Sequence, residues 1–183
     1  TGHDEIGSLA SHMNDTMERM RNYVGAMQKQ AYQDELTSVK NVAAYDKKVY
    51  DLNQKISAGQ AAFAVVMVDL NQLKEVNDRF GHEKGNIALQ TLCRAVCRLY
   101  KHSPVYRIGG DEFVVILEGE DYDNRDALFQ KVQAFERIRD LKAAQPWTQL
   151  AASVGMAVYD QTCDATYQAV FNRADARMYE QKQ

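Results

Sequence analysis

Apolar side chains in the first 31 residues recur at alternating intervals of four and three positions. The positions are Ile6, Ala10, Met13, Met17, Met20, Val24, Met27 and Ala31. Such a heptad repeat places its apolar residues on one stripe of a helix. A helix packed on its own domain could share part of this pattern, but a repeat of this length favours pairing between two chains. We therefore expect residues 1–31 to form a coiled-coil helix that pairs with a second copy.

From residue 32 onward the pattern changes to alternating strand and helix segments. Four apolar runs predict buried strands, the middle two joined as a hairpin: 61–70, 104–108, 113–117 and 150–158. Apolar residues at helical spacing predict helices in four further segments: 31–52 (after a turn), 84–100, 125–144 and 165–182. This order indicates an α/β domain over residues 32–183, with a mixed central β-sheet flanked by helices.

The composition narrows the class of protein. Hydrophobic residues make up 45% and charged residues 26%, as in a soluble globular protein, and a net charge of −3 gives no general attraction to nucleic acid. Three widely spread cysteines, Cys93, Cys97 and Cys163, predict a reducing compartment rather than a disulfide framework. The chain does not begin with Met and starts inside a patterned helix, so we expect a piece of a longer protein.

Acidic side chains stand where two of the predicted strands end. Asp69 closes the apolar run 61–70, and Asp111 and Glu112 follow two glycines at the hairpin turn. If the two strands are neighbours, the three carboxylates meet at one edge of the sheet. Carboxylates with an open coordination sphere suit Mg²⁺ together with phosphate oxygens, and two such ions support phosphoryl transfer. The alternative is a solvated turn in which Asp69 is a helix N-cap.

The segment that follows residue 70 carries a weaker signal. It contains Lys74, Asn77, Gly81 and Gly85. We expect the two glycines to bracket a loop before a helix. Backbone N–H groups after the strand, next to the lysine, are suited to triphosphate oxygens. The GxxxxGK[ST] pattern of a P-loop is missing, and a single lysine is more often a surface charge.

Five motifs, in the same order along residues 32–183, resemble those of the GGDEF domain of diguanylate cyclases. They are DELTSVKN (34–41), DLNQLKEVNDRFGHEKGN (69–86), RIGGDEF (107–113), SVGMA (153–157) and ADARMYEQK (174–182). The segment DEIGSLASHMNDTM (4–17) resembles the C-terminal half of a HAMP signalling module, which usually follows a transmembrane helix.

The resemblance implies an enzyme that condenses two GTP molecules into cyclic di-GMP and releases pyrophosphate. Each domain would hold one GTP, so the implied assembly is a homodimer paired by the coiled coil, without nucleic acid. The implied setting is the cytoplasmic output domain of a membrane-anchored receptor. Alternatives are a cyclic dinucleotide synthase of altered base specificity, a non-catalytic GTP-binding effector module, and a purely structural dimerisation element.

Carried over by position, the resemblance also implies site residues. Two Mg²⁺ ions, replaceable by Mn²⁺, would be held by Asp69, the Leu70 carbonyl, Asp111 and Glu112. The catalytic carboxylates would be Asp111, which accepts the 3′-hydroxyl proton, and Glu112. The substrate-binding residues would be Leu73, Lys74 and Lys182 at the phosphates, and Asn77 and Asn86 at the base.

Two departures from the family pattern change these expectations. Asn86 stands where Asp is common. A carboxylate accepts from both guanine N1–H and the exocyclic amine, whereas an amide offers one acceptor and one donor, as adenine's edge requires. We therefore expect a weakened guanine preference. Tyr100 and Ser103 occupy the positions of an Arg-x-x-Asp product-inhibition site, so we expect no product inhibition there.

Overall fold

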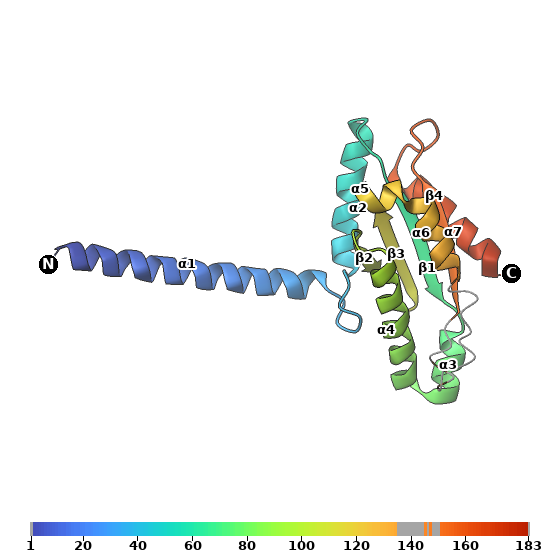
Figure 1. The fold of residues 1–183 in the computed structure, drawn as a ribbon, viewed down its shortest axis with the longest axis horizontal. Coiled ribbons are helices and arrows are strands. Elements are labelled where there is room, and N and C mark those ends of the chain that lie inside the picture. The colour runs from blue at the N-terminus through green and yellow to red at the C-terminus, as the bar shows by residue number, and fades with distance from the viewer. Residues whose placement is uncertain (1, 135–144, 146, 148–150, 183) are drawn as a thin grey trace. The chain divides into compact units, whose positions relative to one another are not determined.

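The computed structural model describes residues 2–134, 145, 147 and 151–182. The chain divides into two compact units, residues 1–33 and residues 34–183 (Figure 1). The first unit is one long helix, α1 (Gly2–Tyr32). The second unit holds the sheet and the remaining helices.

The predicted apolar seam of α1 is exposed to solvent in the single chain. Met13, Met17 and Met20 are 60%, 47% and 63% exposed, and Ile6 is 69% exposed. A stripe of large apolar side chains left uncovered in this way is typical of helices that pair with another helix. None of the helices in the described residues is both long and apolar enough to cross a membrane.

The second unit is built on a four-stranded sheet in the order β2-β3-β1-β4. The strands are β1 (Ala64–Leu70), β2 (Val105–Arg107), β3 (Glu112–Leu117) and β4 (Ala152–Val158). The helices are α2 (Val42–Ser57), α3 (Leu73–Phe80), α4 (His82–Leu99), α5 (Gly119–Asp123), α6 (Arg125–Gln133) and α7 (Tyr167–Lys182). The expected α/β class, a central sheet flanked by helices, is confirmed. These strands pair antiparallel, and a parallel contact occurs at the isolated Lys40–Tyr106 bridge.

Alternation of side chains along the strands creates two cores, one on each face of the sheet. Val66 and Val68 of β1 pack in one core with apolar residues of α4 and α6, whereas Val65 and Met67 pack in the other with α2 and α7. Every residue of β1 is buried because both faces are covered. The same alternation places Asp69 on the face that α7 covers.

The loop expected between Gly81 and Gly85 is wrong, because α4 begins at His82, and a further helix, α3, comes before it. Gln72 has a left-handed backbone (φ 61°) and turns the chain from β1 directly into α3. Leu73, Val76 and Phe80 give this short helix an apolar spacing that the sequence reading missed. Gly81, with φ 88°, ends α3 and leads into α4, so Gly85 lies inside a helix rather than in a loop.

The other predicted helices agree in place but differ in length. The predicted 165–182 helix is α7, and the predicted 84–100 helix is α4, which begins two residues earlier at His82. The segment predicted at 125–144 contains α6, which ends at Gln133, and residues 135–144 lie outside the described part of the chain.

Gly155 lets α7 pack directly on β4. A Cβ atom at this position would lie 2.2 Å from the Ala174 carbonyl oxygen and 2.4 Å from the Met178 backbone nitrogen. Backbone atoms of a helix cannot move aside as a flexible side chain can. The glycine therefore sets the separation between the sheet and the helix that carries Lys182.

We predict that Gly155→Ala destabilises the domain because the new methyl group forces α7 away from β4. The expected loss is roughly 1–3 kcal/mol, or about 2–4 °C in Tm per kcal/mol. Gly110→Ala is the control, since a Cβ there meets no atom within 4 Å. Thermal unfolding measures both variants. Equal Tm values for the two would contradict the assigned packing.

Candidate active site

Two of the predicted carboxylates lie opposite each other on neighbouring strands. β1 and β3 pair antiparallel, and Asp69 is the register partner of Glu112. Each lies two residues from an apolar side chain that packs in the α2/α7 core, Met67 in β1 and Val114 in β3. Because side chains alternate along a strand, both carboxylates project to the face covered by α7. The expected meeting of these strand ends is confirmed.

Asp69 is a buried carboxylate with one oxygen paired and one unpaired. The residue is 4% exposed, and its Oδ2 lies 3.0 Å from Lys182 Nζ at the end of α7. Its buried Oδ1 makes no hydrogen bond within the described residues. The alternative reading as a helix N-cap is wrong, because Asp69 lies inside β1 and Gln72 is the N-cap residue of α3.

The hairpin tip that carries Asp111 is tied to the end of β1. The Leu70 N–H donates to the Asp111 carbonyl (3.0 Å), and the Ile108 N–H donates to the Glu112 carbonyl (3.1 Å). A Cβ at Gly109 would lie 2.6 Å from Glu112 Oε2. The glycine therefore leaves room for the Glu112 carboxylate to fold back against the turn.

The three carboxylates repel one another. Burial raises the pKa of Asp69 above its ordinary value, and the charge of Asp111 adds to this although Lys182 opposes it. Burial likewise raises the pKa of Glu112, with further contributions from Asp69 and Asp111. Concentrated negative charge beside an unpaired carboxylate oxygen favours a cation.

These residues fit a magnesium site that substrate completes. No group of three or more His, Cys, Asp or Glu side chains in the described chain forms a ready-made metal cluster. Mg²⁺ does not require one, because it commonly uses one or two carboxylates with water and phosphate oxygens. The unpaired Oδ1 of Asp69 is the available ligand, beside Asp111 and Glu112. The Leu70 carbonyl remains a predicted ligand.

The predicted base-binding residues lie on the α3–α4 helix pair. The Asn77 side chain packs so closely over Gly85 that a Cβ there would be 1.8 Å from Asn77 Oδ1. Leu73 contacts the same glycine position from the first turn of α3. Asn86, the next residue along α4, is exposed. The structure thus places the Asn77 amide against Gly85, the residue that precedes Asn86.

Two predicted phosphate-binding residues lie on different elements. Lys74 is exposed on α3 and lines an open pocket of about 570 Å³. Asp69, Asp111 and Glu112 do not line this pocket, so the pocket does not define the metal site. Lys182 instead reaches Asp69 from α7.

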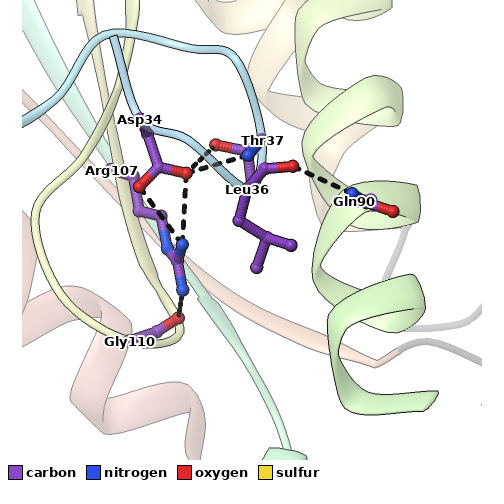
Figure 2. A network of polar contacts seen from close by, with 6 residues as sticks. All are labelled: Asp34, Leu36, Thr37, Gln90, Arg107 and Gly110. Carbon is purple, nitrogen blue, oxygen red and sulfur yellow. Dashed lines mark hydrogen bonds and ion pairs between the residues drawn. The ribbon is translucent and has the colours of Figure 1, made fainter. Parts of the chain in front are cut away.

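A polar network behind the hairpin was missed by sequence reasoning. Figure 2 shows Arg107 between Asp34 and the Gly110 carbonyl, and Gln90 of α4 bonded to Leu36. Both Asp34 and Arg107 lie inside motifs noted in the sequence, but neither motif reveals that they pair.

The two residues at the positions of the product-inhibition site, Tyr100 and Ser103, both have structural roles within the domain. Tyr100 is 1% exposed within the α4-side core. Ser103 Oγ donates to the buried Asp121 at 2.6 Å. Neither residue is available as the charged group that such an inhibition site uses.

We predict that Asp69→Asn stabilises the metal-free protein at pH 7. A carboxyl whose folded pKa is raised costs stability once it ionises, so the gain should shrink as pH falls toward the ordinary value of 3.8. Thermal unfolding in chelator at pH 7 and pH 4 measures this. A lower Tm at pH 7 would contradict the burial cost assigned to Asp69.

Asp34→Asn is the matched control, and we expect it to change Tm at pH 7 in the opposite direction. Burial alone would raise the pKa of Asp34, but hydrogen bonds from Thr37 and Arg107 outweigh it and lower the pKa. Its carboxylate therefore stabilises the fold above the unfolded pKa, and this contribution disappears as pH falls through the lowered one. Asp34→Asn should lower Tm at pH 7.

Comparison with known proteins places this geometry in a family. A protein named diguanylate cyclase TpbB from Pseudomonas aeruginosa (strain UCBPP-PA14) is 28% identical over 182 residues, covering 96% of this chain and 41% of the relative. Diguanylate cyclase DgcP from Escherichia coli (strain K12) is 29% identical over 172 residues, covering 91% of this chain and 49% of the relative. The chain thus spans less than half of each.

Solved structures share the fold. The coiled coil and GGDEF domain of DgcB from Caulobacter crescentus, in complex with c-di-GMP, matches 96% of this chain and 94% of that one, with a TM-score of 0.76 and 22% identity. Residues 31–183 match the family model described as "Diguanylate cyclase, GGDEF domain". This chain therefore belongs to the GGDEF domain family.

Proposed function

We propose that residues 32–183 are a diguanylate cyclase domain that condenses two GTP molecules into cyclic di-GMP. In each step a 3′-hydroxyl oxygen attacks the α-phosphorus of the other GTP. The bond between the α-phosphorus and the bridging oxygen breaks, and pyrophosphate leaves. The observation that carries the proposal is the placement of Asp69. Its buried carboxylate has one oxygen without a hydrogen-bond partner in the described residues, and it lies opposite Glu112 on the neighbouring strand, next to the turn that carries Asp111.

The roles of the residues follow from this placement. Asp69, the Leu70 carbonyl, Asp111 and Glu112 would hold Mg²⁺, which when bound lowers the cost of charge on the transferring phosphate. Mn²⁺ could replace it. Asp111, half-buried at the hairpin turn, is proposed to accept the 3′-hydroxyl proton. The ammonium group of Lys182, already beside Asp69, is proposed to contact phosphate oxygens as well.

The α3–α4 pair is proposed to bind the nucleotide. The first turn of α3, with Leu73 and Lys74, offers backbone N–H groups for phosphate. Asn77 and Asn86 are proposed to bind the base. Asn77 packs against Gly85, which places its amide at the contact between α3 and α4.

We further propose that α1 pairs two copies of the chain. One domain holds one GTP, so synthesis needs two domains, and the exposed seam of α1 supplies a surface for pairing. A HAMP-like identity for residues 4–17, attachment to a membrane receptor and a cytoplasmic location of the domain belong to the same proposal.

The first prediction concerns turnover. The parent chain, incubated with Mg²⁺ and GTP, should release pyrophosphate and form cyclic di-GMP, detected by mass spectrometry. Asp111→Ala should abolish product because both a metal ligand and the proton acceptor are lost. We expect a fall of at least about 10³-fold in kcat, the combined size of these effects.

Asp126→Ala is the matched control, since Asp126 is an exposed aspartate of α6. It should retain parental turnover. If neither the parent nor its variants form product although GTP binds, the non-catalytic effector module becomes the better description. Loss of activity in Asp126→Ala would show that the effect of Asp111→Ala is not specific to the site.

A second candidate function is a cyclic dinucleotide synthase with relaxed base preference. Asn86 favours it, since an amide cannot accept both guanine donors. Replacing it with Asp should shift turnover from ATP toward GTP by roughly tenfold or more, the size of a bidentate base contact. The measurement is the ratio of kcat/KM values for the two nucleotides.

Asn172→Asp serves as the control for charge alone. Asn172 is exposed on α7 and hydrogen-bonds with Gln168. The same amide-to-acid change there should leave the GTP/ATP ratio as in the parent. An unchanged ratio in Asn86→Asp would rule out a specificity role for Asn86.

A further inference from the structure

The segment between the helical first unit and α2 forms a closed turn over residues 34–40. Asp34 Oδ1 accepts from the Thr37 N–H (2.9 Å) and the Thr37 hydroxyl (2.6 Å). The Asp34 N–H donates to the Val39 carbonyl (2.8 Å), and the Ser38 N–H donates to the Asp34 carbonyl (2.9 Å). These four internal hydrogen bonds make the turn a defined element rather than a loose connection.

Arg107 connects this turn to the hairpin tip. Its Nη1 donates to both carboxylate oxygens of Asp34, at 3.1 and 3.2 Å, and its Nη2 donates to the Gly110 carbonyl at 2.8 Å (Figure 2). The Asp34 and Arg107 side chains are only 21% and 17% exposed, so the pair is partly shielded from water and salt.

The same turn also reaches the neighbouring elements. Gln90 Nε2 of α4 donates to the Leu36 carbonyl at 2.9 Å, one helical turn beyond Asn86. On the β2 side, the Lys40 N–H donates to the Val105 carbonyl and the Arg107 N–H donates to the Lys40 carbonyl, at 3.1 and 2.9 Å. The turn thus contacts α4, which carries Asn86, and β2, whose Arg107 reaches the hairpin tip.

We propose that Arg107 is a positioning residue for the catalytic turn, and that Gln90 ties the same 34–40 turn to the base-binding end of α4. Together they fix the metal-binding tip relative to the nucleotide-binding helix. The inference rests on the proposed function and deepens it, because it assigns to residues outside the reacting groups the alignment of the site's two halves.

The Gly110 carbonyl is a suitable point at which to hold the hairpin tip in position. A glycine leaves the backbone free to rotate, so the peptide unit that leads into Asp111 needs an external anchor. Arg107 holds the carbonyl before Asp111, while the Leu70 N–H holds the carbonyl of Asp111 itself. With both carbonyls held, Asp111 is directed toward the Asp69 end of β1.

Arg107→Lys tests the first half of the proposal. Lysine keeps the charge but lacks the planar fork that reaches Asp34 and Gly110 together. With Mg²⁺ and GTP, kcat should fall by about 10- to 100-fold, as for a misplaced catalytic group, while KM changes little. Mn²⁺ binding without nucleotide, followed by electron paramagnetic resonance, should weaken in parallel. Thermal unfolding establishes that the variant is folded at the assay temperature.

Arg125→Lys is the matched control, because Arg125 also donates to a backbone carbonyl, that of Tyr122, but belongs to α6. It should leave kcat and Mn²⁺ binding at parental values. Parental kcat and Mn²⁺ affinity in Arg107→Lys would overturn the positioning role, as would an equal loss in the control.

Gln90→Glu tests the second half, since it keeps the side chain's size but removes the donor to Leu36. KM for GTP should rise several-fold, of the order expected for one lost hydrogen bond, with Mn²⁺ binding unchanged. An unchanged KM would overturn the link to α4. If the parent itself makes no cyclic dinucleotide, the proposed function fails, and the Mn²⁺ titration of Arg107→Lys still decides the role of Arg107.

Discussion

The burial of the Asp69 carboxylate at the end of β1 is the constraint on which the rest of the site depends. A buried, unsatisfied polar atom costs about 1–3 kcal/mol, and each fully buried Val, Met or Phe side chain contributes roughly 1.5–3 kcal/mol. The completely buried apolar residues of β1 therefore more than offset one unpaired carboxylate oxygen. The cores on both faces of the sheet thus stabilise β1 enough for it to carry a buried carboxylate with an unpaired oxygen, which could coordinate a cation.

Alternation along the strands then determines which groups meet. Asp69 and Glu112 project to one face because they lie at matched positions of antiparallel strands, and α7 covers that face closely because Gly155 has no side chain. That close packing brings Lys182 to Asp69. The lysine partly neutralises a cluster that would otherwise repel itself, while one carboxylate oxygen is left unpaired. The same geometry therefore serves the stability of the metal-free domain and its readiness to bind a cation.

The sequence was sufficient to predict the strands and the carboxylates at their ends. It was insufficient to predict helix α3 and the side-chain pairings between distant elements. Continuous apolar runs identify β1 and β4 because both faces of these strands are covered, and the Gly-Gly-Asp-Glu stretch marks the hairpin. The helix α3 was missed because it begins from a left-handed Gln72, a conformation that residue type does not predict. The pairings of Arg107 with Asp34 and of Lys182 with Asp69 join distant segments, so only the strand order and the helix packing reveal them.

The site is assembled from two parts with different physical requirements. The proposed metal-binding edge is strongly charged and is formed by strand ends and a turn held on both sides by hydrogen bonds. The proposed base-binding part is a helix pair that presents amide side chains, with Asn77 packed over Gly85 and Asn86 exposed. On the proposed function, Asn at position 86 would change base preference without disturbing the carboxylates, because it lies on a separate element. The proposed phosphoryl transfer would still require both parts at the correct separation, and the turn 34–40 connects to each of them, through Arg107 on one side and Gln90 on the other.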